Sequence, residues 1–226
     1  MTGGAKLRLF FEGQRMHFAV LVVLLAAVWG LTGLPGFGAG EFLGLSTMTW
    51  AAIAIADAVL HQVYVWLCWR AELHGQTLTR WFGGRAFAVY GAGFTLLFAA
   101  RPVLVFALGW SNRGTLEFYP WLGYGASLVL AVPVIYLMIS VRRYFTFRRA
   151  FGIDHFDAEF RTLPMERRGI FHFSPNAMYV FGFLLLWMPA FLFQSSAALG
   201  IAAFSHAYIW VHYFATEKPD MTHIYG

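Results

Sequence analysis

The stretch that decides the fold is residues 176–214, which read NAMYVFGFLLLWMPAFLFQSSAALGIAAFSHAYIWVHYF. It is almost wholly apolar. As a helix rising about 1.5 Å per residue, it would be close to twice as long as a membrane is thick. The polar triplet Gln194-Ser195-Ser196 interrupts it midway. This pattern predicts a helical hairpin made of two membrane-spanning helices, near residues 178–193 and 197–214.

Four more apolar stretches precede the hairpin, near residues 17–34, 47–69, 86–110 and 121–140. Each is long enough to cross a hydrocarbon core about 30 Å thick as a helix. We therefore expect an all-α, polytopic membrane protein with about six transmembrane helices. Residues 1–226 would form a single integral-membrane domain: four spans within 1–140, a cytoplasmic or interfacial loop over 141–175, and the hairpin with a C-terminal cofactor segment over 176–226.

The composition agrees with a membrane protein. Hydrophobic residues make up 59% of the chain and charged residues 12%, and the mean hydropathy is +0.61. Soluble domains carry about 25% charged residues, so both a water-soluble monomer and a disordered chain are excluded. The single cysteine, Cys68, excludes an internal disulfide framework. No pattern with metal-ligand spacing occurs, so no metal is expected.

The basic residues give the expected orientation, because Lys and Arg accumulate on the cytoplasmic side of a membrane. With six spans, fourteen of the sixteen Lys and Arg residues fall on one side. Arg113 falls on the other side, and Arg101 lies inside the third span. This alternation places both termini in the cytoplasm. It also explains the pI of about 9.6 without nucleic acid as a partner.

Ionisable residues inside the spans are costly and are functional candidates by default. Asp57 and His61 are four residues apart in the second span, so they share a helix face. Arg101 in the third span is an available partner for Asp57. We favour an Asp57–Arg101 pair that pins two helices together over a lipid-headgroup or proton-handling site.

The polar loop before the hairpin alternates arginines with aromatic residues at its start. This is typical of an interfacial helix, and the same arginines would suit the phosphate of a lipid substrate at an anionic membrane surface. The candidate substrate contacts are Arg142, Arg143, Arg148 and Arg149. Asp154, His155, Asp157 and Glu159 follow, and we expect them to be solvated rather than catalytic.

Two polar segments flank the hairpin and would meet at the membrane surface. Residues 167–182 read RRGIFHFSPNAMYVFG, and residues 212–226 read HYFATEKPDMTHIYG. Glu217 lies at the end of a helix, where the helix dipole disfavours a carboxylate. A carboxylate in this place would suit a cationic or hydroxyl-rich ligand rather than helix stability.

These segments resemble the integral-membrane methyltransferases that include phosphatidylethanolamine N-methyltransferases and isoprenylcysteine carboxyl methyltransferases. The signature of that family is Gly-x-x-Arg-x-x-(Arg/Asp)-(His/Asn)-Pro-x-Tyr, then a helical hairpin, then Glu-Glu, often with Pro. The matching residues are Gly169, Asn176, Met178, Tyr179, Glu217 and Pro219, and Ile224-Tyr225 matches the ending of the phospholipid branch. The departures are His172 for Arg, Pro175 for the basic residue, Ala177 for Pro and Lys218 for the second Glu.

The resemblance implies S-adenosylmethionine, held between the start of the fifth span and the end of the sixth. It implies cofactor contacts at Gly169, Phe171, His172, Asn176, Met178, Tyr179 and Glu217, and lays a Gly-x-Gly of the phospholipid branch on Gly123 and Gly125. The implied reaction is N-methylation of phosphatidylethanolamine or its methylated derivatives. Because an ethanolamine headgroup is an ammonium at neutral pH, a proton acceptor is needed. His172, titratable near pH 7, is the candidate for that role, and Glu217 is the other catalytic candidate.

Two alternatives stay open. The same cofactor would serve another acceptor, such as an isoprenylcysteine carboxylate or a small thiol or amine. A non-catalytic, lipid-binding membrane protein is the second alternative, because Ala177 and Lys218 depart from the family pattern. The expected partner is a phospholipid in the bilayer. The expected location is a bacterial inner membrane or, alternatively, the endoplasmic reticulum.

Overall fold

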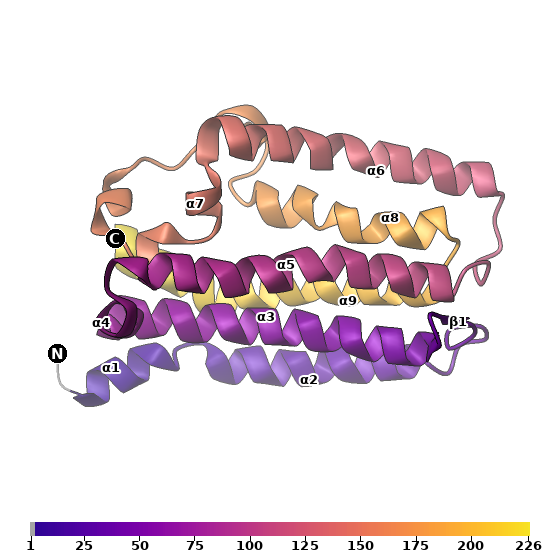
Figure 1. The fold of residues 1–226 in the computed structure, drawn as a ribbon, viewed down its shortest axis with the longest axis horizontal. Helices are drawn as coiled ribbons and strands as arrows, with labels where there is room; N and C mark the ends of the chain where they lie inside the picture. The colour runs from indigo at the N-terminus through magenta and orange to yellow at the C-terminus, as the bar shows by residue number, and fades with distance from the viewer. Residues whose placement is uncertain (1–2) are drawn as a thin grey trace.

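The structure, a computed structural model, describes residues 3–226 and is almost entirely helical. Figure 1 shows the long helices lying side by side as a bundle. The α-helices are α1 (Gly3–Phe10), α2 (Gln14–Leu31), α3 (Thr47–Gly75), α4 (Thr77–Phe82), α5 (Ala86–Ser111), α6 (Pro120–Ser140), α7 (Phe147–Ala150), α8 (Leu184–Leu192), α9 (Ser196–His212) and α10 (Lys218–Tyr225). The shorter helical turns are η1 (Gly83–Arg85), η2 (Val141–Phe145), η3 (Ile153–His155), η4 (Ala158–Thr162), η5 (Gly169–His172), η6 (Met178–Gly182) and η7 (Tyr213–Glu217). Two short antiparallel strands complete the set, β1 (Glu41–Phe42) and β2 (Leu45–Ser46), with Glu41 opposite Ser46.

The first four of the six predicted membrane spans are present as long apolar helices. Within residues 3–226, four helical stretches are long and apolar enough to cross a membrane: Gly4–Leu31, Thr47–Gly75, Thr77–Ser111 and Pro120–Phe145. The predicted hairpin is present as well, and α8 packs against α9. Its first arm, Met178–Leu192, is apolar but shorter than the other spans. The all-α, polytopic fold with a C-terminal hairpin is thus confirmed.

Local sequence explains where several helices begin. The hydroxyl of Ser46 caps α3 by accepting a hydrogen bond from the backbone N–H of Thr49 at 3.2 Å. Ser195 caps α9 in the same way, accepting from the backbone N–H of Ala198 at 3.0 Å. Pro120 occupies the first turn of α6, where its missing N–H costs nothing. The polar triplet that interrupts the apolar run therefore starts the second arm of the hairpin.

Helix α9 lies at the centre of the bundle and contacts α2, α3, α5 and α8. Many of its buried residues are small, among them Ala197, Ala198, Gly200 and Ala202. In lipid, helices associate through close van der Waals packing rather than a hydrophobic driving force, so small residues at the contact favour it. The hairpin's second arm is therefore enclosed by protein on several sides.

The polar pair inside the bundle joins α3 to α5. Nε of Arg101 lies 3.3 Å from Oδ2 of Asp57, and both side chains are buried. A second guanidinium nitrogen of Arg101 lies 3.0 Å from Nδ1 of His61. This geometry agrees with the pinning of two helices that the sequence predicts.

The two ends of the bundle differ in character. Figure 1 shows both chain ends beside α4 and α7, while the β1–β2 turn lies at the opposite end. The loops that carry most of the Lys and Arg residues gather at the first end. This segregation is the one that the charge pattern predicts.

Ala202 and Ala203 offer a test of the central position of α9. Ala202 is fully buried, whereas its neighbour Ala203 is exposed on the same helix. Ala202→Leu should lower the free energy of unfolding by about 1–3 kcal/mol, because the larger side chain overpacks a helix contact. Ala203→Leu should leave it nearly unchanged. Thermal denaturation of both variants in the same detergent measures this, and equal losses would contradict the packing described.

Candidate functional site

A cavity of about 790 Å³ lies at the end of the bundle that carries α7 and α10. Its walls come from segments far apart in the chain: the end of α3, the loop between α6 and α8, and the turns on both sides of the hairpin. The lining residues are Trp69, Phe145, Arg149, Ala150, Gly152, Asp154, His155, Met165, Glu166, Arg167, Phe171, His172, Pro175, Asn176, Met178, Tyr179, Tyr213, Glu217, Lys218, Met221, Thr222, Tyr225 and Gly226.

Three of the turns around this cavity, η2, η6 and η7, are π-helical. A π turn changes the direction of the side chains that it carries and is frequent at functional sites. The turn η6 opens the hairpin and carries Tyr179, while η7 follows α9 and carries Glu217. The two turns continue the helices of the hairpin, and they direct the side chains of Tyr179 and Glu217 toward the cavity.

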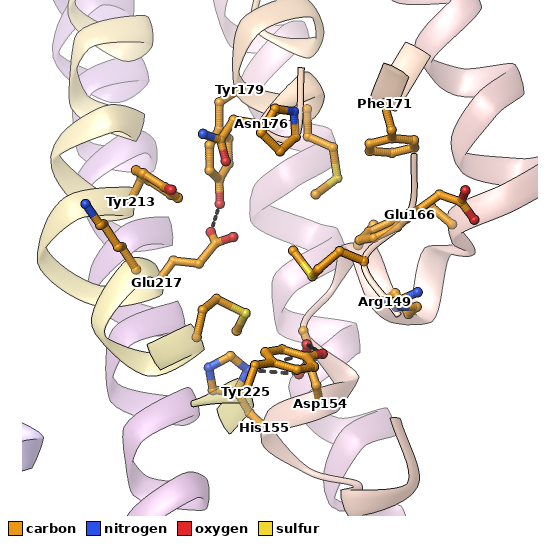
Figure 2. A pocket seen from close by; sticks show the side chains of 18 of the residues that line it. Arg149, Asp154, His155, Glu166, Phe171, Asn176, Tyr179, Tyr213, Glu217 and Tyr225 are labelled. Carbon is orange, nitrogen blue, oxygen red and sulfur yellow. Dashed lines mark hydrogen bonds and ion pairs between the residues drawn. The ribbon is translucent and has the colours of Figure 1, made fainter. Parts of the chain in front are cut away.

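Tyr179 and Glu217 meet at the wall of the cavity. The hydroxyl of Tyr179 donates a hydrogen bond to a carboxylate oxygen of Glu217, as Figure 2 shows. The ring of Tyr213 packs edge-on against that of Tyr179, with 5.8 Å between the ring centroids. The hairpin thus brings together the two sequence segments that carry the family resemblance.

Glu217 is partly open to the cavity, but the surrounding protein still desolvates its carboxyl group. Burial raises the pKa of Glu217 to about 8; the nearby His155 opposes this rise, and the charges of Asp154 and Asp220 add to it. A carboxyl group with this pKa gains or loses its proton near neutral pH.

A buried guanidinium next to η7 holds this part of the chain in place. Nε of Arg70 donates to Oδ1 of Asp220 at 2.9 Å, and neither side chain is exposed. The same guanidinium donates to the carbonyl oxygens of Leu9 and Glu12, both at 2.7 Å, and of Ala215 at 3.2 Å. Arg70 therefore ties the break between α1 and α2 to the turn that presents Glu217.

Gly13 shows how closely these two segments approach each other. Its φ is +76°, in the left-handed region that favours glycine. A side chain at this position would collide with the carbonyl group of Ala215 in η7. The start of α2 therefore packs directly against the Glu217 turn.

His155 continues the network on the far side of Asp220. Its ring is fully buried and stacks on Trp69, with 4.1 Å between centroids. Its Nε2 lies 3.4 Å from Oδ2 of Asp220, and its Nδ1 lies 3.6 Å from Oδ1 of Asp154. Burial alone would lower the pKa of His155, but the two carboxylates hold it above its usual value. The charged imidazolium is therefore favoured.

The expectation that Asp154 and His155 are solvated is wrong. Asp154 is 8% exposed and His155 1% exposed. Both are buried because α10 covers them: Asp220 faces His155, and the hydroxyl of Tyr225 donates to Oδ2 of Asp154 at 2.8 Å. These partners lie far along the chain, so no local sequence pattern signals the burial.

The predicted cofactor residues divide into two groups. Those that line the cavity are Phe171, His172, Asn176, Met178, Tyr179 and Glu217. Gly169 does not line it. Its φ is +60°, and a side chain there would press against Ser140, whose hydroxyl accepts the backbone N–H of Ile170 at 3.1 Å. Gly169 thus lets the loop dock on the end of α6.

Gly123 and Gly125 are not brought to the cavity. They lie in the first turns of α6, about 25 Å along the helix from its other end, Ser140, next to which the cavity begins. A side chain at Gly123 would collide with the carbonyl group of Phe191 in α8. Close packing of α6 on α8 explains this glycine.

Of the four predicted substrate arginines, only Arg149 lines the cavity. Arg142 and Arg143 are exposed. The guanidinium of Arg148 lies over the rings of Phe87 and Phe160. Two cationic residues outside that set also line the cavity, Arg167 and Lys218. Both residues lie within the two polar segments that flank the hairpin, and this position is the sequence signal that could have identified them.

The comparisons with known proteins address the same part of the chain. Residues 120–226 match the model of the phospholipid methyltransferase family. This match confirms the resemblance to membrane phospholipid and isoprenylcysteine methyltransferases. It begins with α6 and includes every lining segment of the cavity except the end of α3. The family implies a methyltransferase with a methyl donor and a lipid substrate in a membrane. Neither a curated protein nor a solved structure shows a significant match to the chain.

Arg70→Met tests whether the hydrogen bonds of the buried Arg70 guanidinium stabilise the protein. The change leaves the carboxylate of Asp220 buried without its main partner, which should cost about 3–5 kcal/mol of stability. Arg80→Met, at an exposed position of α4, is the matched control and should change little. Denaturation followed by circular dichroism in detergent compares the two. Equal stability of both variants would show that Arg70 is dispensable.

Proposed function

We propose that this protein is an S-adenosylmethionine-dependent phospholipid N-methyltransferase that acts on phosphatidylethanolamine or its methylated derivatives. The observation that carries the proposal is the contact between Tyr179 and Glu217 at the cavity wall. These residues come from the two segments that resemble the family signature, and both lie within the matched residues 120–226.

The cavity fits the proposed methyl donor. Its volume of about 790 Å³ is within the range of small-molecule sites, roughly 300–1,000 Å³. The aromatic rings of Phe145, Phe171 and Tyr213 line it and offer faces for a purine base. The carboxyl group of Glu217 offers a partner for a positive charge or for ribose hydroxyls. When bound, S-adenosylmethionine would supply a methyl group activated by its sulfonium.

The side chains at the start of the hairpin would hold and orient the donor. Asn176 provides both a hydrogen-bond donor and an acceptor from one amide group, and Tyr179 provides a hydroxyl. The hydrogen bond from Tyr179 fixes the direction of the Glu217 carboxylate. Such positioning lowers the barrier of a displacement that needs no covalent enzyme intermediate.

The acceptor side of the proposal rests on the cationic residues of the cavity. Arg149, Arg167 and Lys218 line it, and a lipid phosphate is an anion that arginine recognises well. We therefore propose that Arg149 contacts the headgroup phosphate. Arg142, Arg143 and Arg148 would act at the surrounding membrane surface.

The ammonium group of the acceptor has to lose a proton before its nitrogen can act as a nucleophile. Glu217 is the first candidate acceptor for this proton, because a carboxylate with a pKa of about 8 is a stronger base than an ordinary one. His172 is the second candidate, because its exposed ring lines the same cavity. We further propose a cytoplasmic location for this end of the bundle, in a bacterial inner membrane or the endoplasmic reticulum.

Binding of S-adenosylmethionine to the purified protein, measured by calorimetry, tests the donor. The wild type should bind it, and above pH 8, where Glu217 is ionised, Glu217→Gln should raise the dissociation constant by about tenfold or more, the effect of losing a charged hydrogen-bond partner. Glu159→Gln, an exposed change in the loop, should bind as the wild type does. A wild type that binds no donor would overturn the proposed function.

Lipid extracts identify the acceptor. Expression of the chain in a host without phosphatidylcholine should produce mono-, di- or trimethylated phosphatidylethanolamine. If donor binding is normal but no methylated lipid appears, the acceptor is another one, such as a prenylcysteine carboxylate.

The reaction should also depend on pH in a defined direction. Below pH 8 the carboxyl group of Glu217 holds its proton and accepts none, and above it the ionised form dominates. At saturating donor, kcat/KM for the lipid should therefore rise with pH through about 8. Glu217→Gln should remove this limb of the profile. A wild-type profile that is flat between pH 6.5 and 8.5 would exclude Glu217 as the proton acceptor.

A further inference from the structure

The cavity has a second polar end, away from Tyr179. Figure 2 shows Glu217 between Tyr179 and a group formed by Tyr225, His155 and Asp154. The electrostatic influence of Asp154 and His155 on Glu217 agrees with this arrangement. The proposed donor contacts include neither Asp154 nor Tyr225, and Asp154 matches no residue of the family signature.

Asp154 has an unused hydrogen-bonding position. Its Oδ2 accepts the hydroxyl of Tyr225 at 2.8 Å. Its Oδ1 is buried and accepts no hydrogen bond from any residue in 3–226, and the Nδ1 of His155 lies 3.6 Å away. A buried carboxylate oxygen without a donor is unfavourable, and the Asp154 side chain, 11% exposed, lines the cavity, so a cation beside this carboxylate would be stabilised.

The charges around this end leave room for one cation. The positive charges of Arg70 and His155 balance the negative charges of Asp154 and Asp220. Burial acts against ionisation of Asp154, but His155 and Tyr225 hold its pKa below the usual value. When Glu217 ionises, it adds a carboxylate that forms no ion pair with any residue in 3–226, although Arg149, Arg167 and Lys218 also line the cavity. A bound cation would neutralise it.

The site for a cation at Asp154 lies beside a site for an anion at Arg149. Burial and Asp154 raise the pKa of Tyr225 to about 12, and the guanidinium of the neighbouring Arg149 opposes this rise. Arg149 also lines the cavity, and its side chain is fixed by a hydrogen bond to the carbonyl oxygen of Pro164 at 3.1 Å. An ammonium at Asp154 and a phosphate at Arg149 are the two charges of a phosphoethanolamine headgroup.

We propose that Asp154 and Tyr225 form the subsite for the ammonium group of the acceptor, with Arg149 beside them for its phosphate. This inference rests on the proposed function and adds the position and class of the acceptor to it. The ammonium pairs with the Asp154 carboxylate and passes a proton to a carboxylate oxygen of Glu217. The nitrogen keeps the electron pair of the broken N–H bond and becomes a nucleophile.

The subsite selects between acceptor classes. An ammonium is attracted by the carboxylates of Asp154 and Glu217, whereas a carboxylate acceptor is repelled by both. The inference therefore favours lipid amines over prenylcysteine carboxylates. The same chemistry would also recognise the amino group of the methyl donor, and the experiment separates these two sources.

Asp154→Asn is the decisive variant, because it keeps the shape and the acceptor for Tyr225 but removes the charge. Asp157→Asn, three residues along the same loop, is the matched control; Asp157 does not line the cavity, and its side chain accepts the backbone N–H of Glu159. Both are measured as the full chain in micelles that contain phosphatidylethanolamine. Donor affinity is measured by calorimetry without lipid, and kcat/KM for the lipid at saturating donor.

Asp154→Asn should lower kcat/KM for phosphatidylethanolamine by about tenfold or more while the donor dissociation constant stays within about twofold. Asp157→Asn should change neither. Tyr225→Phe, which removes only the hydroxyl that orients Asp154, should lower kcat/KM in the same direction and serves if Asp154→Asn does not fold. An equal loss of donor affinity would assign the subsite to the donor's amino group, and an unchanged kcat/KM would remove the subsite altogether. A wild type that binds no donor instead refutes the proposed function, so the two failures are distinct.

Discussion

A buried guanidinium at the junction of four chain segments is the interaction on which the site depends. Arg70 reaches from α3 to Asp220 in α10, to carbonyl oxygens in the last turn of α1 and just after it, and to the carbonyl of Ala215 in η7. A buried charge needs hydrogen-bond partners, and carbonyl groups at helix interruptions have no partner within the helix. The hydrogen bonds between the Arg70 guanidinium and these carbonyl groups therefore satisfy both. The interruptions at Gly13 and η7 are therefore stable, and the second of them places Glu217 at the cavity.

The same network separates two carboxyl groups that share one cavity. Asp154 lies against His155 and Tyr225, and its pKa is held below the usual value in spite of burial. Glu217 forms no ion pair with any residue in 3–226, and burial raises its pKa to about 8. Carboxyl groups whose surroundings push their pKa values apart can divide the work of binding and proton transfer. In the proposed reaction, Asp154 binds the cation and Glu217 takes the proton.

The sequence predicted four membrane spans and the hairpin, because lipid imposes long, uninterrupted apolar stretches and because Pro120 and Ser195 mark helix starts. It also predicted that Asp57 would pair with Arg101, because an isolated charge in a membrane is too costly. It failed at Asp154 and His155. Their polar, charged surroundings in the sequence are typical of a solvated loop, and only the docking of α10 buries them.

The sequence by itself determined the membrane-spanning class, the number and limits of the apolar stretches, and the two motif segments around the hairpin. These features depend on local composition and on spacing along one chain. The tertiary structure decided which polar residues share the cavity: it brought Tyr179 to Glu217, placed Asp154 beside Tyr225, and left Gly123 and Gly125 at the far end of α6. Electrostatic surroundings depend on distances in space, and contacts between residues far apart in the chain set those distances.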